Sequence, residues 1–235
     1  MGIWAGQVTL DDLLFTSEEM QQIGIQHLAP IVDISGHADM TERVGLFESF
    51  VAEFEPLLGH TPRWEGFCFI VRELLSRDTL RILETGTLRK VGNWAGDGCS
   101  TKIWDWIKEH KVGDTQVVSV DSSRAACTIA QAECPHVHVM HEDSIVYLRQ
   151  TNPKLKLDLL YLDSYDYHPG LELNACMHQV AELAAIWERL PSGCLIASDD
   201  SHNSMQGKPV LTRRLLSMLF IEPLLDSYIV VWKKP

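Results

Sequence analysis

Acidic side chains end several short apolar runs in the second half of the chain. Asp121, Asp163 and the pair Asp199-Asp200 each follow such a run. If the runs are parallel strands, these residues lie along one edge of a sheet, where ligands of open α/β folds bind. An acid after the second strand can accept both hydrogen bonds of a ribose diol. The pattern indicates a nucleoside site.

A turn that contains glycine precedes these acids. The first apolar run ends at residues 84–87 (Glu-Thr-Gly-Thr), and Ser100 opens a helix after a loop with further glycines. Glycine lets the backbone approach a ligand closely, and a helix N-terminus offers free N–H groups. The same residues also fit a purely structural turn, so the interpretation depends on Asp121 at the end of the next strand.

The third apolar run ends in Glu142-Asp143-Ser144, where an acceptor could bind an adenine amino group. A structural role is equally consistent with the pattern, because aspartate at a strand-to-helix turn commonly caps the following helix. This alternative applies to Asp121, which precedes a helix from about Ser122, and to Asp143. Both interpretations stay open at this point.

The elements that would position these residues follow from hydrophobic periodicity. Helical spacing predicts a helix over residues 41–58 and a second over 61–76, capped by Thr61. From Arg81 onward, short apolar runs alternate with helical segments, which implies parallel strands joined by right-handed crossovers. Residues 221–234 suit an antiparallel hairpin. We expect an α/β fold: a doubly wound, Rossmann-like, mostly parallel sheet with a terminal antiparallel hairpin and an N-terminal helical extension. Residues 1–80 would form a helical arm or lid, and residues 81–235 the ligand-binding domain.

Composition narrows the class of protein further. The 235 residues are 46% hydrophobic and 22% charged, as in ordinary globular proteins, and the net charge is −12. Such an excess of acid disfavours nucleic acid and anionic membranes as partners, because both are captured by clustered Lys and Arg. The start of the chain lacks the pattern of a secretory signal, and the six cysteines are scattered, so we expect a cytoplasmic protein with reduced thiols. The N-terminal helices could also serve for homo-oligomer formation.

The strand-end residues resemble those of a known family. Glu84-x-Gly86, Asp121, Glu142-Asp143-Ser144, Asp163 and Ser192-Gly193 occur in the order and spacing of class I S-adenosylmethionine-dependent methyltransferases, from about Arg81 to the C-terminus. The Asp after the fourth strand, with Asp-Asp after the fifth, is similar to metal-dependent O-methyltransferases of the catechol and macrolide-sugar types. In one respect the chain departs from the family, because the loop at residues 88–98 is longer than usual.

The resemblance implies a set of functional residues. The cofactor S-adenosylmethionine would be bound by Glu84, Gly86, Thr87, Ser100, Asp121, Ser122, Asp143, Ser144 and Asp163. Mg²⁺ or a similar divalent cation would be held by Asp163, Asp199 and Asp200. The implied reaction is metal-assisted O-methylation of a small molecule, with a sugar or aromatic hydroxyl as the acceptor.

Methyl transfer to a hydroxyl needs alignment of the two reactants and removal of a proton. A bound cation would help by lowering the pKa of the acceptor oxygen. Asp166, His168 and His202 are the candidates for the base, because they follow the two strands that carry the expected metal ligands. The sequence does not rank them.

Other functions share part of this pattern, and relatives of the fold that keep the cofactor also include proteins linked to hydroxylation or to methylation of nitrogen. A glycine turn and an acid after the second strand also describe nicotinamide-dependent oxidoreductases, although the loop lacks the tight G-x-G-x-x-G spacing. A non-catalytic binding protein that keeps the fold is the second alternative, because a fold does not by itself imply a function.

Overall fold

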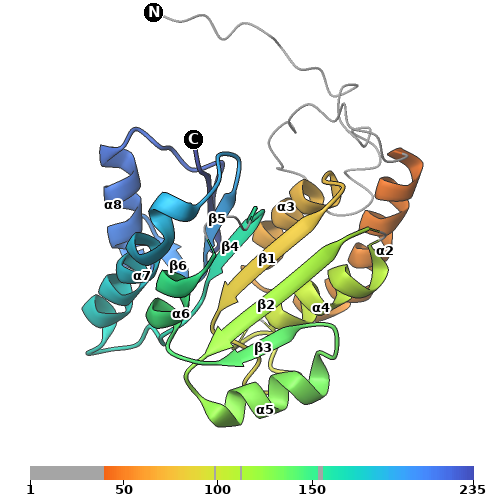
Figure 1. Ribbon diagram of the computed structural model, residues 1–235, viewed down its shortest axis with the longest axis horizontal. Coiled ribbons are helices and arrows are strands. Elements are labelled where there is room, and N and C mark those ends of the chain that lie inside the picture. Colours follow the sequence, from red (N-terminus) through yellow and green to blue (C-terminus); the bar gives the residue numbers. More distant parts are fainter. Residues whose placement is uncertain (1–39, 98, 112, 153–155) are drawn as a thin grey trace, which may run out of the picture.

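The computed structural model describes residues 40–97, 99–111, 113–152 and 156–235 (Figure 1). Residues 1–39 of the predicted N-terminal arm, nearly half of it, therefore lie outside the described residues, as does Gly98 in the long loop. The division of the chain at residue 80 stays a prediction. Within the described residues, no helix is long and apolar enough to cross a membrane.

Two helices precede the sheet, as the periodicity predicts. They are α2 (Met40–Leu58) and α3 (Trp64–Leu75). The predicted apolar stripe of the second helix is buried, including Phe67 and Ile70. The predicted cap was wrong: Thr61 donates its hydroxyl to the carbonyl oxygen of Leu58, and the helix begins after Arg63, which makes no side-chain cap.

Seven strands form one mixed sheet in the order β3-β2-β1-β4-β5-β9-β8. The first five in chain order pair in parallel, and β9 joins antiparallel to β5 and to β8, which confirms the predicted terminal hairpin. The strands are β1 (Leu80–Thr85), β2 (Thr115–Asp121), β3 (His138–His141), β4 (Leu159–Leu162), β5 (Leu195–Ser198), β8 (Leu225–Asp226) and β9 (Val230–Lys233).

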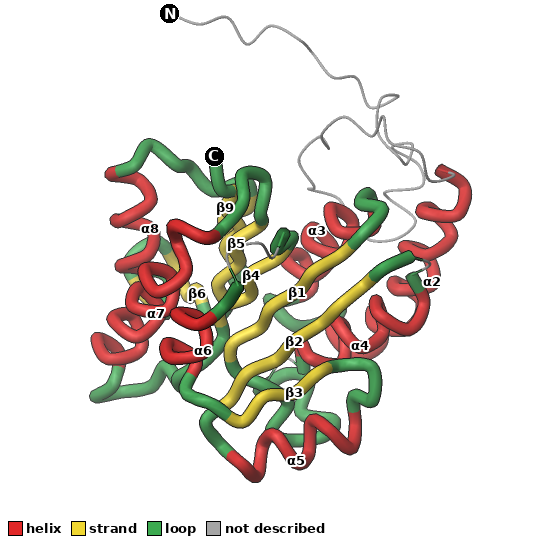
Figure 2. The backbone as a smooth tube through the Cα atoms, viewed as in Figure 1, coloured by secondary structure: helices red, strands yellow, loops and turns green. Residues whose placement is uncertain are grey.

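Helices cover both faces of this sheet, which makes three layers (Figure 2). Neighbouring residues of a strand point to opposite faces, so Ile82 and Leu83 belong to different hydrophobic clusters. One cluster joins the sheet to α2, α3, α4 (Ser100–His110) and α5 (Arg124–Glu133). The other joins it to α6 (Ser144–Gln150), α7 (Glu172–Ile186) and α8 (Val210–Met218). The predicted doubly wound α/β fold is confirmed.

The sequence did not reveal two short features. Helix α6 has only seven residues, too few for a helical period to stand out. A small antiparallel hairpin, β6 (Ser201–Asn203) with β7 (Gln206–Gly207), lies between β5 and α8. This hairpin determines where Lys208 is placed.

Candidate active site at the carboxyl edge of the sheet

The five parallel strands end on the same side, so the acidic residues that follow them share one edge of the sheet (Figure 1). A cavity of about 230 Å³ opens there. Its wall comes from the loops after β1, β2, β3 and β4, together with the first turns of the helices that follow. Among its lining residues are Gly86, Thr87, Ser100, Asp121, Ser122, Asp143, Ser144, Asp163 and Asp166.

Gly86 forms the turn that begins the cavity. Its φ is +82°, in the left-handed region that favours glycine. A Cβ atom at this position would lie 2.7 Å from the carbonyl oxygen of Asp163. The Gly86 N–H donates to the carbonyl of Val120 at 2.8 Å. Glycine is required here because the turn must pass close to the end of β4.

Glu84 does not face the cavity. The side chain is fully buried, and its carboxylate accepts hydrogen bonds from Ser100, Thr101, Trp104 and Ser119 at 2.5–2.8 Å. We expected Glu84 to bind the cofactor, and the structure corrects this: the period-two alternation of β1 turns it toward α4. Burial raises the pKa of Glu84, although the four donors oppose that shift. Its role is to hold the N-terminus of α4 against the sheet.

Asp121, at the end of β2, lines the cavity and also supports its wall. The carboxylate accepts the backbone N–H of Thr87 at 3.1 Å and that of Ser123 at 2.7 Å. The cap of α5 is the Ser123 side chain, which accepts from the Ala126 N–H. Asp121 is therefore not the helix cap. An ionised carboxylate has about four acceptor positions, so two remain for a ligand diol.

Beyond β3, Asp143 caps α6 by accepting the Val146 N–H at 2.9 Å, so the structural interpretation holds for this residue. The side chain also lines the cavity, and the two roles are compatible because only one oxygen is used. Next to it, the Ser144 hydroxyl lies 3.2 Å from Nε2 of His178. The sequence analysis did not single out His178, which reaches the cavity from α7.

His178 is supported by a buried carboxylate one helical turn away. Its Nε2 lies 3.4 Å from Oε1 of Glu182, and that oxygen accepts the Ser164 hydroxyl at 2.5 Å. The hydrogen bond with Glu182 raises the pKa of His178 above its ordinary value, against the opposing effect of burial. A spacing of four residues on a predicted helix was the available signal, since such residues share a face.

Asp163, Asp199 and Asp200 do come together, but with two basic residues between them. The two basic residues are Arg63 and Lys208. We call these two residues and the three acids together the acid–base cluster. Arg63 donates to Asp199 and to Asp200, at 2.7 Å in each case. The Lys208 ammonium lies 2.7 Å from Asp163 Oδ1 and 2.9 Å from Asp200 Oδ2. The side chains of Arg63 and Lys208 are only 4% and 2% exposed.

Burial and charge act in opposite directions within the cluster. Burial by itself would lower the pKa of Lys208, but the charges of Asp163 and Asp200 outweigh it and raise that pKa, so the ammonium stays protonated. Arg63 is held charged in the same way by Asp199. Burial raises the pKa of Asp163, whereas Asp200 has a lowered pKa because Lys208 and Arg63 outweigh its burial. Arg63 and Lys208 are therefore two fixed positive charges among the three acids.

The expected divalent cation does not fit these residues. Asp163 Oδ1, both oxygens of Asp199 and both oxygens of Asp200 already accept hydrogen bonds from within the protein. Tyr161 and Tyr228 add hydroxyl donors to Asp199 and Asp200. In the described part of the chain, no three acidic, His or Cys side chains are arranged to hold a metal ion. Lys208 and Arg63 pair with the three carboxylates that were expected to hold the ion.

Two of the three expected bases do not line the cavity. Asp166 lines it, but forms an ion pair with Arg89 at 2.7 Å. His168 and His202 are exposed and are not part of its wall. The His202 ring packs beside Tyr167 and Tyr228 instead. The sequence placed these histidines after the correct strands, but the loops carry them outward.

Arg63 and Lys208 were not identified from the sequence. Arg63 precedes a helix that the pattern assigns to core packing, 136 positions before Asp199. Lys208 follows Asp200 by eight positions, and a basic residue so close to an acidic pair was the available signal.

A solved methyltransferase structure shares this fold. No family model and no curated protein sequence match the chain. The calicheamicin methyltransferase CalS11 is similar to it with a TM-score of 0.52 and 13% identity, over 88% of this chain and 98% of that one. An apo structure of CalS11, described as a TDP-rhamnose 3′-O-methyltransferase, gives 0.48 and 15% over 84% and 96%. A complex of DhpI with SAM and HEP gives 0.43 and 10% over 86% and 100%.

The chain therefore has the fold of class I S-adenosylmethionine-dependent methyltransferases. At 13% identity the likeness to CalS11 concerns the fold. The function has to be argued from the site.

Proposed function

We propose that the protein is an S-adenosylmethionine-dependent methyltransferase that methylates a hydroxyl of a small molecule. The observation that carries the proposal is the single cavity at the carboxyl edge, which joins the Gly86 turn, Asp121, the Asp143-Ser144 pair and Asp163. These residues are the ones expected from the family resemblance to surround the cofactor, and the fold that brings them together is that of the family.

Each part of the cavity suits a different part of the cofactor. Asp121 has free acceptor positions for a ribose diol, as acids after the second strand do in nucleotide-binding sheets. Ser144 and the free oxygen of Asp143 could bind the adenine. The Gly86–Thr87 turn and Ser122 line the wall between them. Asp163 lies where β4 ends, next to the turn at Gly86, and would face the methionine end of the cofactor.

A methyl group on a sulfonium already has a good leaving group, so the protein must mainly align the acceptor with the methyl carbon. A sugar or aromatic hydroxyl is the acceptor we propose. Asp166 is the candidate base that lines the cavity, and release from Arg89 would free its carboxylate. The chemistry that a divalent cation would supply is not part of this proposal, because the acid–base cluster does not fit one. Homo-oligomer formation through the N-terminal helices stays a prediction.

Calorimetric titration of the purified protein with S-adenosylmethionine, S-adenosylhomocysteine and NAD tests the proposal. We expect heat with the first two ligands, and at least about tenfold weaker binding after Asp121→Ala, equivalent to 1.4 kcal/mol. Glu48→Ala, which removes an exposed acid on α2, is the matched control and should bind like the wild type.

Binding of NAD without binding of S-adenosylmethionine would reject the proposal in favour of an oxidoreductase. Binding of S-adenosylmethionine without methyl transfer to any of a panel of sugar and aromatic acceptors would favour the non-catalytic alternative. Release of S-adenosylhomocysteine, detected by mass spectrometry in the presence of one acceptor, would identify the acceptor class directly.

A further inference from the structure

The Lys208 ammonium bridges two acids that come from neighbouring strands. Asp163 follows β4, Asp200 follows β5, and a single nitrogen lies within 2.9 Å of an oxygen of each. The same nitrogen is 3.3 Å from the carbonyl oxygen of Asp163. A divalent cation that bridged these strands would need oxygen atoms of the same two carboxylates. Lys208 therefore competes directly with such an ion.

Arg63 occupies the other side of the acids. Its guanidinium donates through Nε to Asp199 and through Nη2 to Asp200, and its Nη1 contacts the carbonyl of Ala95 at 3.3 Å. The group also lies over the Tyr228 ring, 4.9 Å from the centroid. A planar, permanently charged fork suits this position, because it can satisfy two carboxylates at once. The segment before α3 is thereby joined to the ends of β5 and of the long loop.

The backbone is shaped to place Lys208. The β6–β7 hairpin turns the chain back, and the Lys208 N–H donates to the carbonyl of Asp200 at 3.1 Å. Gly207, just before it, has a φ of +116°, and a Cβ there would lie 2.2 Å from the same carbonyl oxygen. Asp200 itself adopts a left-handed φ of +59°. Two uncommon backbone conformations meet where the lysine enters the cluster, so its position follows from the fold of the loop.

We propose that Lys208 and Arg63 permanently supply the positive charge that a divalent cation would otherwise supply between Asp163, Asp199 and Asp200, and that this edge of the sheet excludes divalent cations. A bound ion would either lie beside two like charges or displace a buried ammonium from its partners, and an unpaired buried charge is strongly unfavourable. The proposal goes beyond the proposed function and does not depend on it. Any chemistry at this edge would then proceed unchanged in a chelator.

Titration with Mn²⁺, followed by the loss of the free-ion signal in electron paramagnetic resonance, tests the exclusion. The wild-type protein should bind no Mn²⁺ up to about 1 mM, the weak end of the range for protein sites of hard cations. Lys208→Ala removes the bridging charge and leaves the acids in place. We expect this variant to bind Mn²⁺ at least about tenfold more tightly, a gain of 1.4 kcal/mol. Mn²⁺ should also raise its melting temperature, because an ion that binds only the folded state stabilises it.

Lys156→Ala, which removes an exposed lysine before β4, is the matched control and should behave like the wild type. If Lys208→Ala does not fold, Lys208→Met retains a long side chain without the charge and serves for the same measurement. Tight Mn²⁺ binding by the wild type that Asp200→Asn abolishes would overturn the proposal. So would a folded Lys208 variant that binds Mn²⁺ no better than the wild type. Neither result depends on binding of S-adenosylmethionine, so failure of the proposed function would be seen separately.

Discussion

Arg63 Nε lies 2.7 Å from Asp199 Oδ2, although 136 positions separate the two residues in the chain. The contact joins the N-terminal helical segment to the central strands at the edge where the cavity opens. Both side chains are almost fully buried. The segment before β1 is thus attached to the same edge as the proposed cofactor site, and its removal would leave Asp199 without its paired cation and Asp200 with Lys208 alone.

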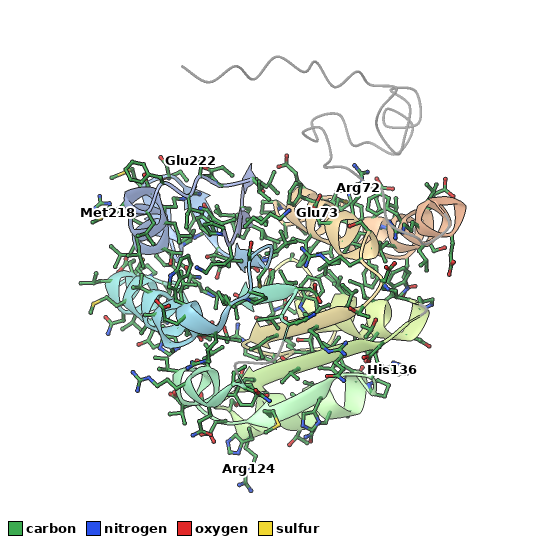
Figure 3. The ribbon with its side chains drawn as sticks, turned by 45° about the horizontal axis from the view of Figure 1, so that its top comes forward. Arg72, Glu73, Arg124, His136, Met218 and Glu222 are labelled. Atoms are coloured by element: carbon green, nitrogen blue, oxygen red, sulfur yellow. The ribbon has the colours of Figure 1, made fainter. Side chains whose placement is uncertain are left out.

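Arg63→Ala should strongly destabilise the protein. The substitution leaves Asp199 buried without its cation, and removing one partner of a buried pair typically costs about 3–5 kcal/mol. Urea denaturation followed by circular dichroism measures the change in the free energy of unfolding. Arg124→Ala is the matched control, because this side chain projects outward from α5 (Figure 3), and it should change stability by less than about 0.5 kcal/mol. Equal stability of the two variants would contradict the buried ion pair.

Gly86→Ala should lower both stability and cofactor affinity. The added Cβ would meet the Asp163 carbonyl at 2.7 Å, and the φ of +82° is unfavourable for alanine, which costs about 1–3 kcal/mol. Thermal unfolding and titration with S-adenosylmethionine measure the two effects. Gly45→Ala in α2 is the control, because a Cβ there meets nothing within 4 Å and alanine is favoured in a helix by up to about 1 kcal/mol. Unchanged affinity in Gly86→Ala would show that the turn does not contact the cofactor.

Glu84→Gln should affect stability much more than ligand binding. The amide would direct its NH₂ group toward donors such as the Trp104 indole N–H, leaving at least one buried donor unpaired, which costs about 1–3 kcal/mol. Chemical denaturation should show this loss. Calorimetry at a temperature where the variant is folded should give an affinity for S-adenosylmethionine within about threefold of the wild type, roughly 0.7 kcal/mol. A loss of affinity as large as that of Asp121→Ala would restore Glu84 as a ligand-binding residue.

Glu182→Gln should lower the pKa of His178. The hydrogen bond with Glu182 raises this pKa above the ordinary value, so the protonated pair stabilises the folded state. This contribution is complete at pH values below the pKa of a histidine in the unfolded chain. The contribution is lost as the pH rises through the folded pKa. Two-dimensional NMR of the imidazole nitrogens over a series of pH values measures the pKa of His178 in the wild type and in the variant. His136, an exposed residue labelled in Figure 3, provides the reference imidazole signal in both proteins. An unchanged His178 titration would mean that Glu182 does not set its protonation.

Glu182 also has an unusual second oxygen. Oε2 is buried and has no hydrogen-bond partner among the described residues. An unpaired buried acceptor costs free energy, so the interactions of the other oxygen, Oε1, must hold the side chain in place. Those interactions are with Ser164 and His178, which both line the cavity, so Glu182 supports the cavity wall.

The sequence by itself determined the arrangement of the strand ends. Alternating apolar runs and helical segments require parallel strands, and parallel strands bring Asp121, Asp143 and Asp163 to one edge whatever the details of packing. A turn with a close backbone approach at Gly86 was likewise indicated by residue type. These conclusions need only local periodicity and the rule for crossovers, which is why they could be made without coordinates.

Only the tertiary structure decided what each acid contacts. The direction of Glu84 depends on which face of β1 is covered by α4, and the cations beside Asp199 and Asp200 come from a helix start far upstream and from a short hairpin. Such contacts arise from the packing of elements that have no periodic relation in sequence. The carboxylates of Asp163, Asp199 and Asp200 are consistent with a metal site when their neighbours are unknown. Once Arg63 and Lys208 are in place, the same carboxylates form ion pairs within the protein.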